Sequence, residues 1–354
     1  MKILVIRFNA IGDVVLSSTI CDSLRKTFPN ARIDYLVHEP SQGLYKHHLS
    51  INQVIGLSWE ERKNPIKYVK KIWSITRTEY DITIDASSTA KSELISLLSR
   101  KSKYRIGRYK KRRGIAYTHR IKQAAERPHK VLQRLELLRP LTEVGYQISY
   151  NEPINLMVTE PERAKMRGII ESHGIDLNKS IFVFCVSSKE PQKKWNRHYI
   201  VETIKHCLDR YQAQIVLFGG LPHELKEVEL VHQDLACVSG VVRKVPINEL
   251  RDLAILFSLC DVFIGNEGGP RHIAQAVGTP TASVFSPSAK KNEWLPITCA
   301  KHQAIEWQEL SKNEAYKDVE FGYGDSLYFK LYNSIQPTDF IPIVDSVIQR
   351  HVSE

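Results

Sequence analysis

A turn between two apolar segments in the last third of the chain carries the residues best suited to chemistry. Residues 261–285 read DVFIGNEGGPRHIAQAVGTPTASVF, which predicts a buried strand, a turn, a helix and a second strand. Gly268 and Gly269 permit a tight turn, and Pro270 suits the first helical position, where its missing N–H would have no partner. A helix that begins just past a parallel strand directs free N–H groups and its positive dipole end at bound anions. The stretch therefore predicts a phosphate-binding turn.

The structural alternative is an ordinary connection from a strand to a helix, and Gly-Gly-Pro alone favours that interpretation. Four polar side chains crowd around this turn, however: Asn266, Glu267, Arg271 and His272. That density is high for a purely structural link between two apolar segments, and Arg271 adds a full positive charge. We therefore interpret the turn as part of a site.

A second candidate lies near the amino terminus, where Asp13 begins a predicted helix after a strand at residues 3–6. As a helix cap or a first-turn acid, Asp13 would stabilise the helix by about 1 kcal/mol. The residues alone favour that structural role. Only Gly12 is present where a dinucleotide-binding fingerprint needs three glycines, which counts against a nicotinamide-dependent dehydrogenase.

Two more polar turns follow predicted strands. Residues 187–195, SSKEPQKKW, contain two hydroxyls and three lysines, and residues 218–224, FGGLPHE, end on an acid at a predicted helix start. A loop lysine is usually only solvated, and Glu224 could be a simple first-turn acid. A cation here would nevertheless stabilise the charge that builds up on a departing diphosphate.

These segments resemble glycosyltransferase family 9, the bacterial lipopolysaccharide heptosyltransferases. That family commonly reads Asn-Asp-Thr-Gly-Pro-Met-His, then an Ala-rich helix and Gly-Thr-Pro. The matching positions here are Asn266, Gly269, Pro270, His272, Ala274, Ala276, Gly278, Thr279 and Pro280. Glu267 stands where the family usually has Asp, and Gly268 where it has Thr. The resemblance covers most of the chain and is specific at residues 3–20, 187–195, 217–224 and 261–287.

The resemblance implies an α/β protein of GT-B architecture, in which two Rossmann-like domains face a central cleft. It implies an inverting enzyme that transfers heptose from ADP-heptose to the lipopolysaccharide inner core without a metal or other cofactor. Asp13, in a segment similar to the family's Ile-Arg-x-x-x-x-Gly-Asp-Val motif, is then the catalytic base. Lys193, the lysine of Lys-x-Trp, meets the donor diphosphate, and Glu224 meets the ribose. The implied donor-binding set also includes Ser187, Ser188, Lys194, Gly220, Asn266, Glu267, Gly268, Gly269, Arg271 and His272.

Between Arg100 and Arg120, arginines and lysines alternate with tyrosines. A solvated loop is one interpretation, and a nucleic-acid surface is another. Anionic lipid headgroups or the phosphates of a lipid-linked acceptor are the third, which we prefer to nucleic acid because no nucleic-acid-binding fold signature accompanies the run. The candidate acceptor or lipid residues are Arg105, Arg108, Lys110, Lys111, Arg112 and Arg113.

Strand and helix signals alternate along both halves of the chain, which predicts two successive α/β units. The predicted domains are residues 1–155, an acceptor-binding domain, and 156–335, a donor-binding domain. A final helix at 336–354 is expected to pack back on the first domain, as the resemblance implies. Helices are predicted at 65–78, with Ile66, Val69, Ile72, Trp73 and Thr76 on one side, at 88–98 after a Ser88 cap, and at 129–141. Residues 290–336 are predicted to be irregular.

Composition sets the remaining limits. The 354 residues are 42% hydrophobic, which excludes a disordered chain, and the net charge of +11 favours an anionic partner. The six cysteines have no Cys-x-x-Cys spacing, and no apolar run has the length of a signal peptide core or a membrane span. We expect a monomer in the cytoplasm that contacts the inner membrane peripherally and binds no nucleic acid. The open alternatives are transfer of a hexose on the same fold and a non-catalytic binder of membranes or nucleic acid.

Overall fold

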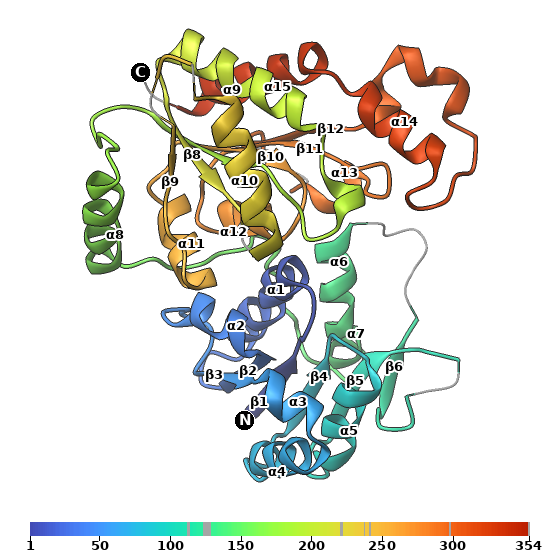
Figure 1. Cartoon of the computed structure of the whole chain (residues 1–354). Helices are drawn as coiled ribbons and strands as arrows, with labels where there is room; N and C mark the ends of the chain where they lie inside the picture. Colours follow the sequence, from blue (N-terminus) through green and yellow to red (C-terminus); the bar gives the residue numbers. More distant parts are fainter. Residues whose placement is uncertain are drawn as a thin grey trace. The chain divides into compact units, whose positions relative to one another are not determined.

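A computed structural model describes residues 1–111, 114–122, 129–219, 222–236, 238–240, 242–296 and 299–352. The chain forms two compact units, each a sheet with helices on it (Figure 1). Unit 1 comprises Met1–Met157 and Glu249–Arg251, and unit 2 comprises Val158–Asn248 and Asp252–Glu354. Arg112, Arg113 and Gly220, which the sequence analysis places in candidate sites, lie outside the described residues.

Unit 1 is built on a parallel sheet of six strands in the order β3-β2-β1-β4-β5-β6. The strands are β1 (Lys2–Ile6), β2 (Arg32–His38), β3 (Gln53–Leu57), β4 (Ile82–Asp85), β5 (Tyr104–Arg108) and β6 (His119–Ile121). Ile3 of β1 pairs with Ile33 on one side and Ile82 on the other. Leu4, Ile6 and Leu36 pack with Ile72 and Ile95 in the core, so the near-continuous apolar strands are covered by helices, as a parallel sheet requires.

The helices of unit 1 are α1 (Ile11–Thr27), α2 (Glu39–Gln42), α3 (Trp59–Lys63), α4 (Pro65–Thr76), α5 (Ala90–Leu98), α6 (Lys130–Leu135) and α7 (Arg139–Glu143), with 3-10 turns at Gly43–Tyr45 and Glu136–Leu138. Helices α1, α4 and α5 lie at predicted positions, and one predicted helix is divided. The single helix predicted at 129–141 is divided into α6, a 3-10 turn and α7. Pro140 explains the division, because a proline has no N–H to continue the preceding helix.

Unit 2 repeats the strand order of unit 1, with β12-β11-β10-β7-β8-β9. Its strands are β7 (Ile181–Cys185), β8 (Gln214–Phe218), β9 (Val242–Lys244), β10 (Val262–Asn266), β11 (Thr281–Val284) and β12 (His302–Ile305). In each sheet the second and third strands of the unit lie on one side of its first strand, and the fourth, fifth and sixth strands lie on the other side. This is the doubly wound order. The prediction of an α/β chain with two Rossmann-like units is confirmed.

The helices of unit 2 are α8 (Glu160–Ser172), α9 (Arg197–Tyr211), α10 (Pro222–Asp234), α11 (Leu250–Phe257), α12 (Gly269–Ala276), α13 (Lys291–Trp294), α14 (Ser326–Ser334) and α15 (Pro337–His351), with 3-10 turns at Pro191–Lys193, Trp307–Glu309 and Ser311–Tyr316. The first turn of α11 belongs to unit 1. The expected packing of residues 336–354 on the first domain is wrong. Helix α15 packs on α9, β10, β11 and β12, because its buried stripe completes the core of unit 2. That stripe consists of Phe340, Val344, Val347 and Ile348.

Seven helices and strands were not predicted: the short helices α2, α3 and α13, and the elements β6, β9, β12 and α14. Strands β6 and β9 have three residues each, and charged side chains interrupt them, so they carry almost no periodic signal. Strand β12 and helix α14 lie within residues 290–336, which we expected to be irregular. Helix α14 has a clear start signal in Asp325, whose side chain accepts a hydrogen bond from the Tyr328 N–H at 2.8 Å.

Two local predictions about unit 1 need correction. Thr89, and not Ser88, is the N-cap of α5, and Ser88 is in the left-handed region with φ +48°. The face predicted for the helix at 65–78 is divided in the structure. Tyr68, Ile72 and Ile75 are buried, whereas Ile66, Val69 and Trp73 are exposed.

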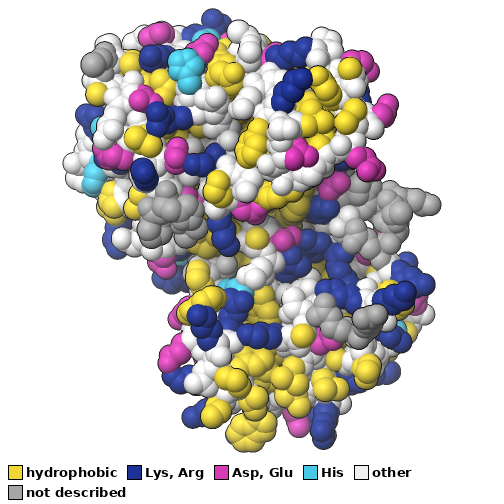
Figure 2. Space-filling model, turned by 45° about the vertical axis from the view of Figure 1, so that its right-hand side comes forward, with side chains coloured by type: hydrophobic (Ala, Val, Ile, Leu, Met, Phe, Trp, Pro, Cys, Tyr) yellow, Lys and Arg dark blue, Asp and Glu magenta, His cyan; other side chains and the backbone are white. Residues whose placement is uncertain are grey.

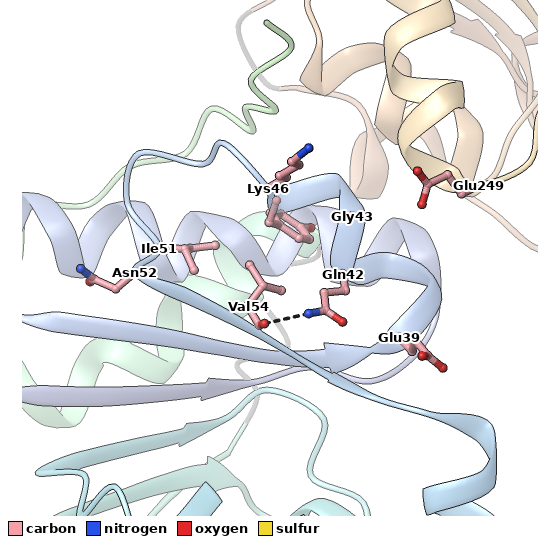
Figure 3. A pocket seen from close by; sticks show the side chains of 9 residues that line it. Glu39, Gln42, Gly43, Lys46, Ile51, Asn52, Val54 and Glu249 are labelled. Carbon is pink, nitrogen blue, oxygen red and sulfur yellow. Dashed lines mark hydrogen bonds between the residues drawn. The ribbon is translucent and has the colours of Figure 1, made fainter. Parts of the chain in front are cut away.

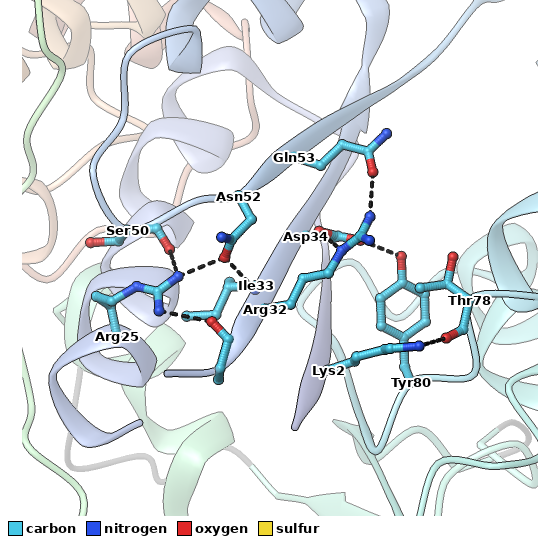
Figure 4. Close-up of polar contacts among 11 residues, drawn as sticks. Lys2, Arg25, Arg32, Ile33, Asp34, Ser50, Asn52, Gln53, Thr78 and Tyr80 are labelled. Carbon is cyan, nitrogen blue, oxygen red and sulfur yellow. Dashed lines mark hydrogen bonds and ion pairs between the residues drawn. The ribbon is translucent and has the colours of Figure 1, made fainter. Parts of the chain in front are cut away.

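The amino-terminal edge of the unit 1 sheet is held by a network of polar side chains (Figure 4). Fully buried Asp34 accepts hydrogen bonds from Arg32 Nε at 3.0 Å and from the Tyr80 hydroxyl at 2.8 Å. Arg25 Nη2 donates to Asn52 Oδ1 at 2.6 Å, and Asn52 Oδ1 also accepts from the Ile33 N–H. These charges are satisfied by protein partners, so they fix the ends of the strands and leave the opposite edge for chemistry.

Candidate active site

The predicted site residues follow the strands at the centre of each sheet. In a doubly wound sheet, ligands bind at the carboxyl ends of the two strands from which the connections run in opposite directions. In unit 1 these strands are β1 and β4, and Asp13 follows β1. In unit 2 they are β7 and β10, which lead into residues 187–195 and into the turn at Gly268. Both sets therefore lie where this fold binds ligands.

Asp13 is the third residue of α1 and one of its oxygens caps the helix. Its Oδ2 accepts a hydrogen bond from the Ala10 N–H at 3.2 Å, so the structural role predicted for a first-turn acid is present. The same oxygen lies 2.7 Å from Arg7 Nη2, and Oδ1 accepts from Arg134 Nη2. The carboxylate keeps 21% of its surface exposed, so a substrate hydroxyl can reach it.

Three arginines surround Asp13, and we call Arg7, Arg108 and Arg134 the arginine cluster. Burial raises the pKa of Asp13, but the charges of Arg7 and Arg134 outweigh burial and hold the pKa below its usual value. Burial, with the charge of Arg7 added, lowers the pKa of Arg134 to about 10, so Arg134 is still a cation at neutral pH. The Nε atoms of Arg7 and Arg134 are buried and have no hydrogen-bond partner. Two buried donors without a partner beside one carboxylate are unusual in a folded protein.

The basic segment does not act as one surface. Arg108 belongs to the arginine cluster, and its Nη2 donates to the Gln133 carbonyl at 3.1 Å. Arg105, in contrast, donates to the carbonyls of Ala116 and Ser102, which ties β5 to the following turn. These two hydrogen bonds give Arg105 a structural role in addition to the predicted acceptor role, which stays a prediction. Lys111 is exposed and Lys110 is half-buried.

The turn that opens α12 depends on two glycines. Gly268 has φ +151° and is the N-cap, a conformation that side chains rarely adopt. Gly265, at the end of β10, has φ +138°, and a Cβ atom there would lie 2.3 Å from the Cys185 carbonyl oxygen. The close approach of β10 and β7 at this point brings the two central strands and their loops together.

Asn266 positions the loop of residues 187–195, which we call the lysine loop. Its Oδ1 accepts from the Trp195 N–H at 2.9 Å and from the Tyr332 hydroxyl at 3.3 Å. Its Nδ2 donates to the carbonyls of Cys185 and Ser187. An amide has two acceptor sites and two N–H groups, so all are used within the protein. This differs from the prediction that Asn266 contacts the donor.

Lys193 and Lys194 point in different directions. Lys193 Nζ lies 3.6 Å from Glu267 Oε1, at the turn that opens α12, and 3.9 Å from Glu190. Lys194 Nζ lies 2.8 Å from Glu227 on α10. The structure thus brings Lys193, Glu267 and Gly268 together from two segments about seventy residues apart, and it directs Lys194 elsewhere.

Arg271 and His272 lie beneath this turn, inside unit 2. Arg271 is fully buried, and its Nε and Nη1 have no partner, while Nη2 contacts His272 Nε2 at 3.2 Å. Burial lowers the pKa of Arg271 to about 10, and Glu267 counteracts part of that shift. The charge strengthens the positive field at the amino end of α12.

The remaining donor candidates are also at the carboxyl edge of this sheet. Glu224 is buried in the first turn of α10, close enough to Cys185 for its charge to influence that thiol. Ser187 is buried with an Oγ that has no partner, and Ser188 is half-buried. Gly269 is the first residue of α12.

Comparison with known proteins decides the family. The model of glycosyltransferase family 9 (heptosyltransferase) matches residues 69–320. The chain belongs to glycosyltransferase family 9. It is 23% identical over 304 residues to lipopolysaccharide heptosyltransferase 1 of Campylobacter coli, covering 80% of this chain and 84% of the relative. It is 25% identical over 338 residues to lipopolysaccharide heptosyltransferase 3 of Escherichia coli K12, covering 87% and 91%.

A solved structure of the E. coli ADP-heptose lps heptosyltransferase II has the same fold. The TM-score is 0.78 at 20% sequence identity, with 100% of both chains covered. The chain is therefore a glycosyltransferase of the GT-B class, as the resemblance implies. The family match begins at residue 69, so Asp13 and Arg7 lie outside it.

Sequence reasoning missed the tyrosines that support the lysine loop of this family 9 enzyme. The Tyr332 hydroxyl donates to the Lys193 carbonyl at 3.1 Å, and the Tyr323 hydroxyl donates to Glu190. Both tyrosines lie beyond residue 320, where the family match ends. The aromatic density of residues 321–332, FGYGDSLYFKLY, was the available signal. Arg134 was missed because an isolated arginine gives no indication of its neighbours in space. Arg7 belongs to the Ile-Arg-x-x-x-x-Gly-Asp-Val motif, but the motif alone gave it no role.

A hollow of about 520 Å³ in unit 1 contains none of the predicted residues (Figure 3). It lies along the edge strand β3, where Gln42 Nε2 donates to the Val54 carbonyl at 3.1 Å. Its lining includes the carboxylates Glu39 and Glu249 and one lysine, Lys46. Two carboxylates disfavour a diphosphate, so this hollow does not have the chemistry of a donor site.

Among the described residues, no group of three or more His, Cys, Asp and Glu side chains could hold a metal ion. No helix in that part of the chain is both long and apolar enough to cross a membrane. Cys21, Cys185, Cys207 and Cys260 are buried free thiols.

Proposed function

We propose that this glycosyltransferase transfers heptose from ADP-heptose to a sugar of the lipopolysaccharide core, with inversion at the anomeric carbon. The observation that carries the proposal is the approach of Lys193 to the turn that opens α12, which provides a cation and free N–H groups for a departing diphosphate. The names of the relatives support the choice of heptose and of the lipopolysaccharide core. The name of the E. coli heptosyltransferase II supports ADP-heptose.

In the proposed reaction, Asp13 takes the proton from a hydroxyl of the acceptor as that oxygen attacks the anomeric carbon. The new C–O bond forms while the bond from the anomeric carbon to the phosphate oxygen breaks, and the electron pair leaves on ADP. Lys193 and the N–H groups at the start of α12 stabilise the leaving oxygen, and Arg271 adds to the field. With these groups in place, we propose that the reaction needs no metal ion.

The ion pairs of Asp13 with the arginine cluster must weaken before Asp13 can act as a base. A carboxylate that pairs with two arginines binds a proton weakly, because protonation would remove both ion pairs. We propose that anionic groups of the acceptor bind Arg7 and Arg134, whose side chains keep 12% and 7% of their surface exposed. That contact shares the positive charge between the acceptor and Asp13, which raises the proton affinity of Asp13 when the acceptor is present.

A donor competition assay tests the proposal. The purified protein is incubated with a de-acylated core acceptor and with ADP-heptose, ADP-glucose or UDP-glucose, and products are identified by mass spectrometry. We expect transfer from ADP-heptose alone, and stabilisation of the protein by ADP in thermal unfolding. Transfer from a hexose donor in preference to ADP-heptose would contradict the choice of sugar. If ADP does not stabilise the protein in thermal unfolding, the proposed donor site is contradicted.

The two neighbouring lysines make a matched pair of variants. Lys193→Ala is expected to lower kcat by about 10- to 100-fold, because one charge that stabilises the leaving group is removed. Lys194→Ala removes a similar charge one residue away, but this lysine pairs with Glu227, so kcat is expected to stay within about threefold. Steady-state kinetics of both variants provide the test. Equal losses in the two variants would show that Lys193 has no special position.

A further inference from the structure

Helices α3 and α4 present an apolar face to the solvent, formed by Trp59, Ile66, Val69 and Trp73. These side chains are 64%, 80%, 52% and 61% exposed. Large exposed side chains are common singly on protein surfaces, but four in two adjacent helices form a patch. In Figure 2, hydrophobic side chains gather at the lower end of the view, where Figure 1 places α4, and Lys and Arg side chains lie beside them. We call these four residues the α3–α4 face.

Helix α4 has three separate sectors. Ile66, Val69 and Trp73 are spaced by three and four residues, so they share one side of the helix. Tyr68, Ile72 and Ile75 share another side, and their burial holds α4 on the sheet of unit 1. Lys67 and Lys71 share a third side, where they pair with Glu60 and Glu61 of α3. The core therefore uses only one of the two apolar sectors.

Basic side chains border the α3–α4 face. Residues 59–77 contain six lysines and arginines and two glutamates, which gives a net charge of 6 − 2 = +4. Arg62 and Lys63 lie over the ring of Trp59, and Arg77 lies over the ring of Trp73, at 4.5 to 5.7 Å. The cations are thus placed next to the exposed tryptophans and are not on the far side of the helices.

We propose that the α3–α4 face binds the surface of an anionic phospholipid bilayer, with Ile66, Val69 and both tryptophans at the level of the lipid headgroups. Tryptophan favours that level because its ring is apolar and its N–H is polar, and lysine stems reach toward lipid phosphates. Helix α4 has 12 residues, so it offers about 18 Å of helix to lie in the plane of the surface. The proposal rests on the proposed function in one respect, since a lipid-carried acceptor gives a reason to bind membranes.

Charge complementarity distinguishes a bilayer from a protein partner. A protein-binding apolar patch is usually depleted in lysine, whereas here lysines and arginines of unit 1 surround the tryptophans. An anionic surface attracts each lysine or arginine near it, and the attraction decreases within the screening length of the salt. The apolar and charged residues therefore act on the same target, and binding is expected to fall when either is removed.

Vesicle flotation tests this proposal with the full chain. The parent protein should float with vesicles of phosphatidylglycerol and phosphatidylcholine, and much less with phosphatidylcholine alone. The double variant I66S/W73S is expected to bind the anionic vesicles with an affinity at least about tenfold lower than that of the parent. The double variant K63Q/K70Q should lose about fivefold in vesicle affinity for each charge removed, and the loss should be smaller at high salt. L49S/L225S removes two exposed leucines outside the face, 79% and 56% exposed, and should bind like the parent.

Two results would overturn the proposal. One is equal flotation of the parent and I66S/W73S while K110Q/K111Q loses binding, which would assign the membrane surface to the basic segment. The other is a parent dimer in sedimentation that I66S/W73S converts to a monomer without any change in flotation, which would assign the face to a second copy of the chain. Thermal stabilisation by ADP is measured on each variant, so a failure of membrane binding is separated from a failure of the proposed enzyme. The tested side chains are exposed, apart from half-buried Lys110, so the variants are expected to fold.

Discussion

Replacing Asp13 by asparagine is expected to lower kcat by about 10²- to 10⁴-fold while ADP binding changes by about twofold or less. Asparagine keeps the size of the side chain but cannot accept a proton from the attacking hydroxyl. The proposed ADP-binding residues belong to unit 2 and Asp13 belongs to unit 1, so the two readouts separate chemistry from donor binding. Steady-state kinetics give kcat, and thermal unfolding with ADP gives donor binding.

Asp81→Asn is the matched control for this variant. The Asp81 carboxylate also accepts a backbone N–H, that of Lys2 at 2.7 Å, but at the opposite edge of the same sheet. Its replacement is expected to change kcat by about twofold or less, because no reacting group is nearby. If D13N keeps a kcat within about tenfold of the parent, Asp13 is not the base.

The pH profile gives a second measure of the same carboxylate. Burial raises the pKa of Asp13, but the charges of Arg7 and Arg134 outweigh burial and lower it, so Asp13 is ionised at neutral pH. If Asp13 is the base, kcat/KM should show no acid limb between about pH 5 and 8. The ion pairs of Asp13 should likewise stabilise the fold above its unfolded pKa and weaken only as pH falls through the lowered value. An acid limb near pH 6 would point to another base.

Replacing Gly265 by alanine is expected to destabilise unit 2 by about 3 kcal/mol or more. The added Cβ would lie 2.3 Å from the Cys185 carbonyl oxygen, and both atoms are fixed by the central strands. The backbone at φ +138° is also unfavourable for alanine. Urea unfolding of the full chain provides the measurement, and loss of stabilisation by ADP should accompany the loss of stability.

Two other glycines separate the sources of this effect. Gly278 has φ +88° with no atom within 4 Å of an added Cβ, so G278A measures backbone strain alone, about 1 kcal/mol. Gly168 lies within α8 with open space around it, so G168A should be neutral or stabilising by up to about 1 kcal/mol. A loss in G265A no larger than in G278A would show that the two strands can separate at this point.

The sequence was most informative where polar residues follow buried strands. The segments around Asp13, Lys193 and Gly268 lie at the carboxyl ends of β1, β7 and β10 because strand and helix signals alternate in order. Alternation with right-handed connections allows few sheet topologies, so the loops that meet at one edge can be predicted without coordinates.

The same reasoning failed where the role of a residue depends on its neighbours in space. Asn266 matches the family motif, yet only the structure shows that its amide is used by the lysine loop and Tyr332. The face of α4 shows the same limit, because periodicity identifies apolar residues on one side of a helix but cannot tell a core from a membrane. The expectation for α15 came from the resemblance alone, and only the structure shows that its buried stripe packs in unit 2.

The support of the lysine loop by the last part of the chain limits how family 9 enzymes can be recombined. Trp195 Nε1 donates to the Ile335 carbonyl at 2.9 Å, and Tyr332 holds the Lys193 carbonyl. A hybrid enzyme joined at residue 320, where the family match ends, would take the lysine from one parent and its support from the other. A hybrid that preserves the proposed role of Lys193 therefore requires that Tyr332 and Ile335 come from the same parent as the lysine loop.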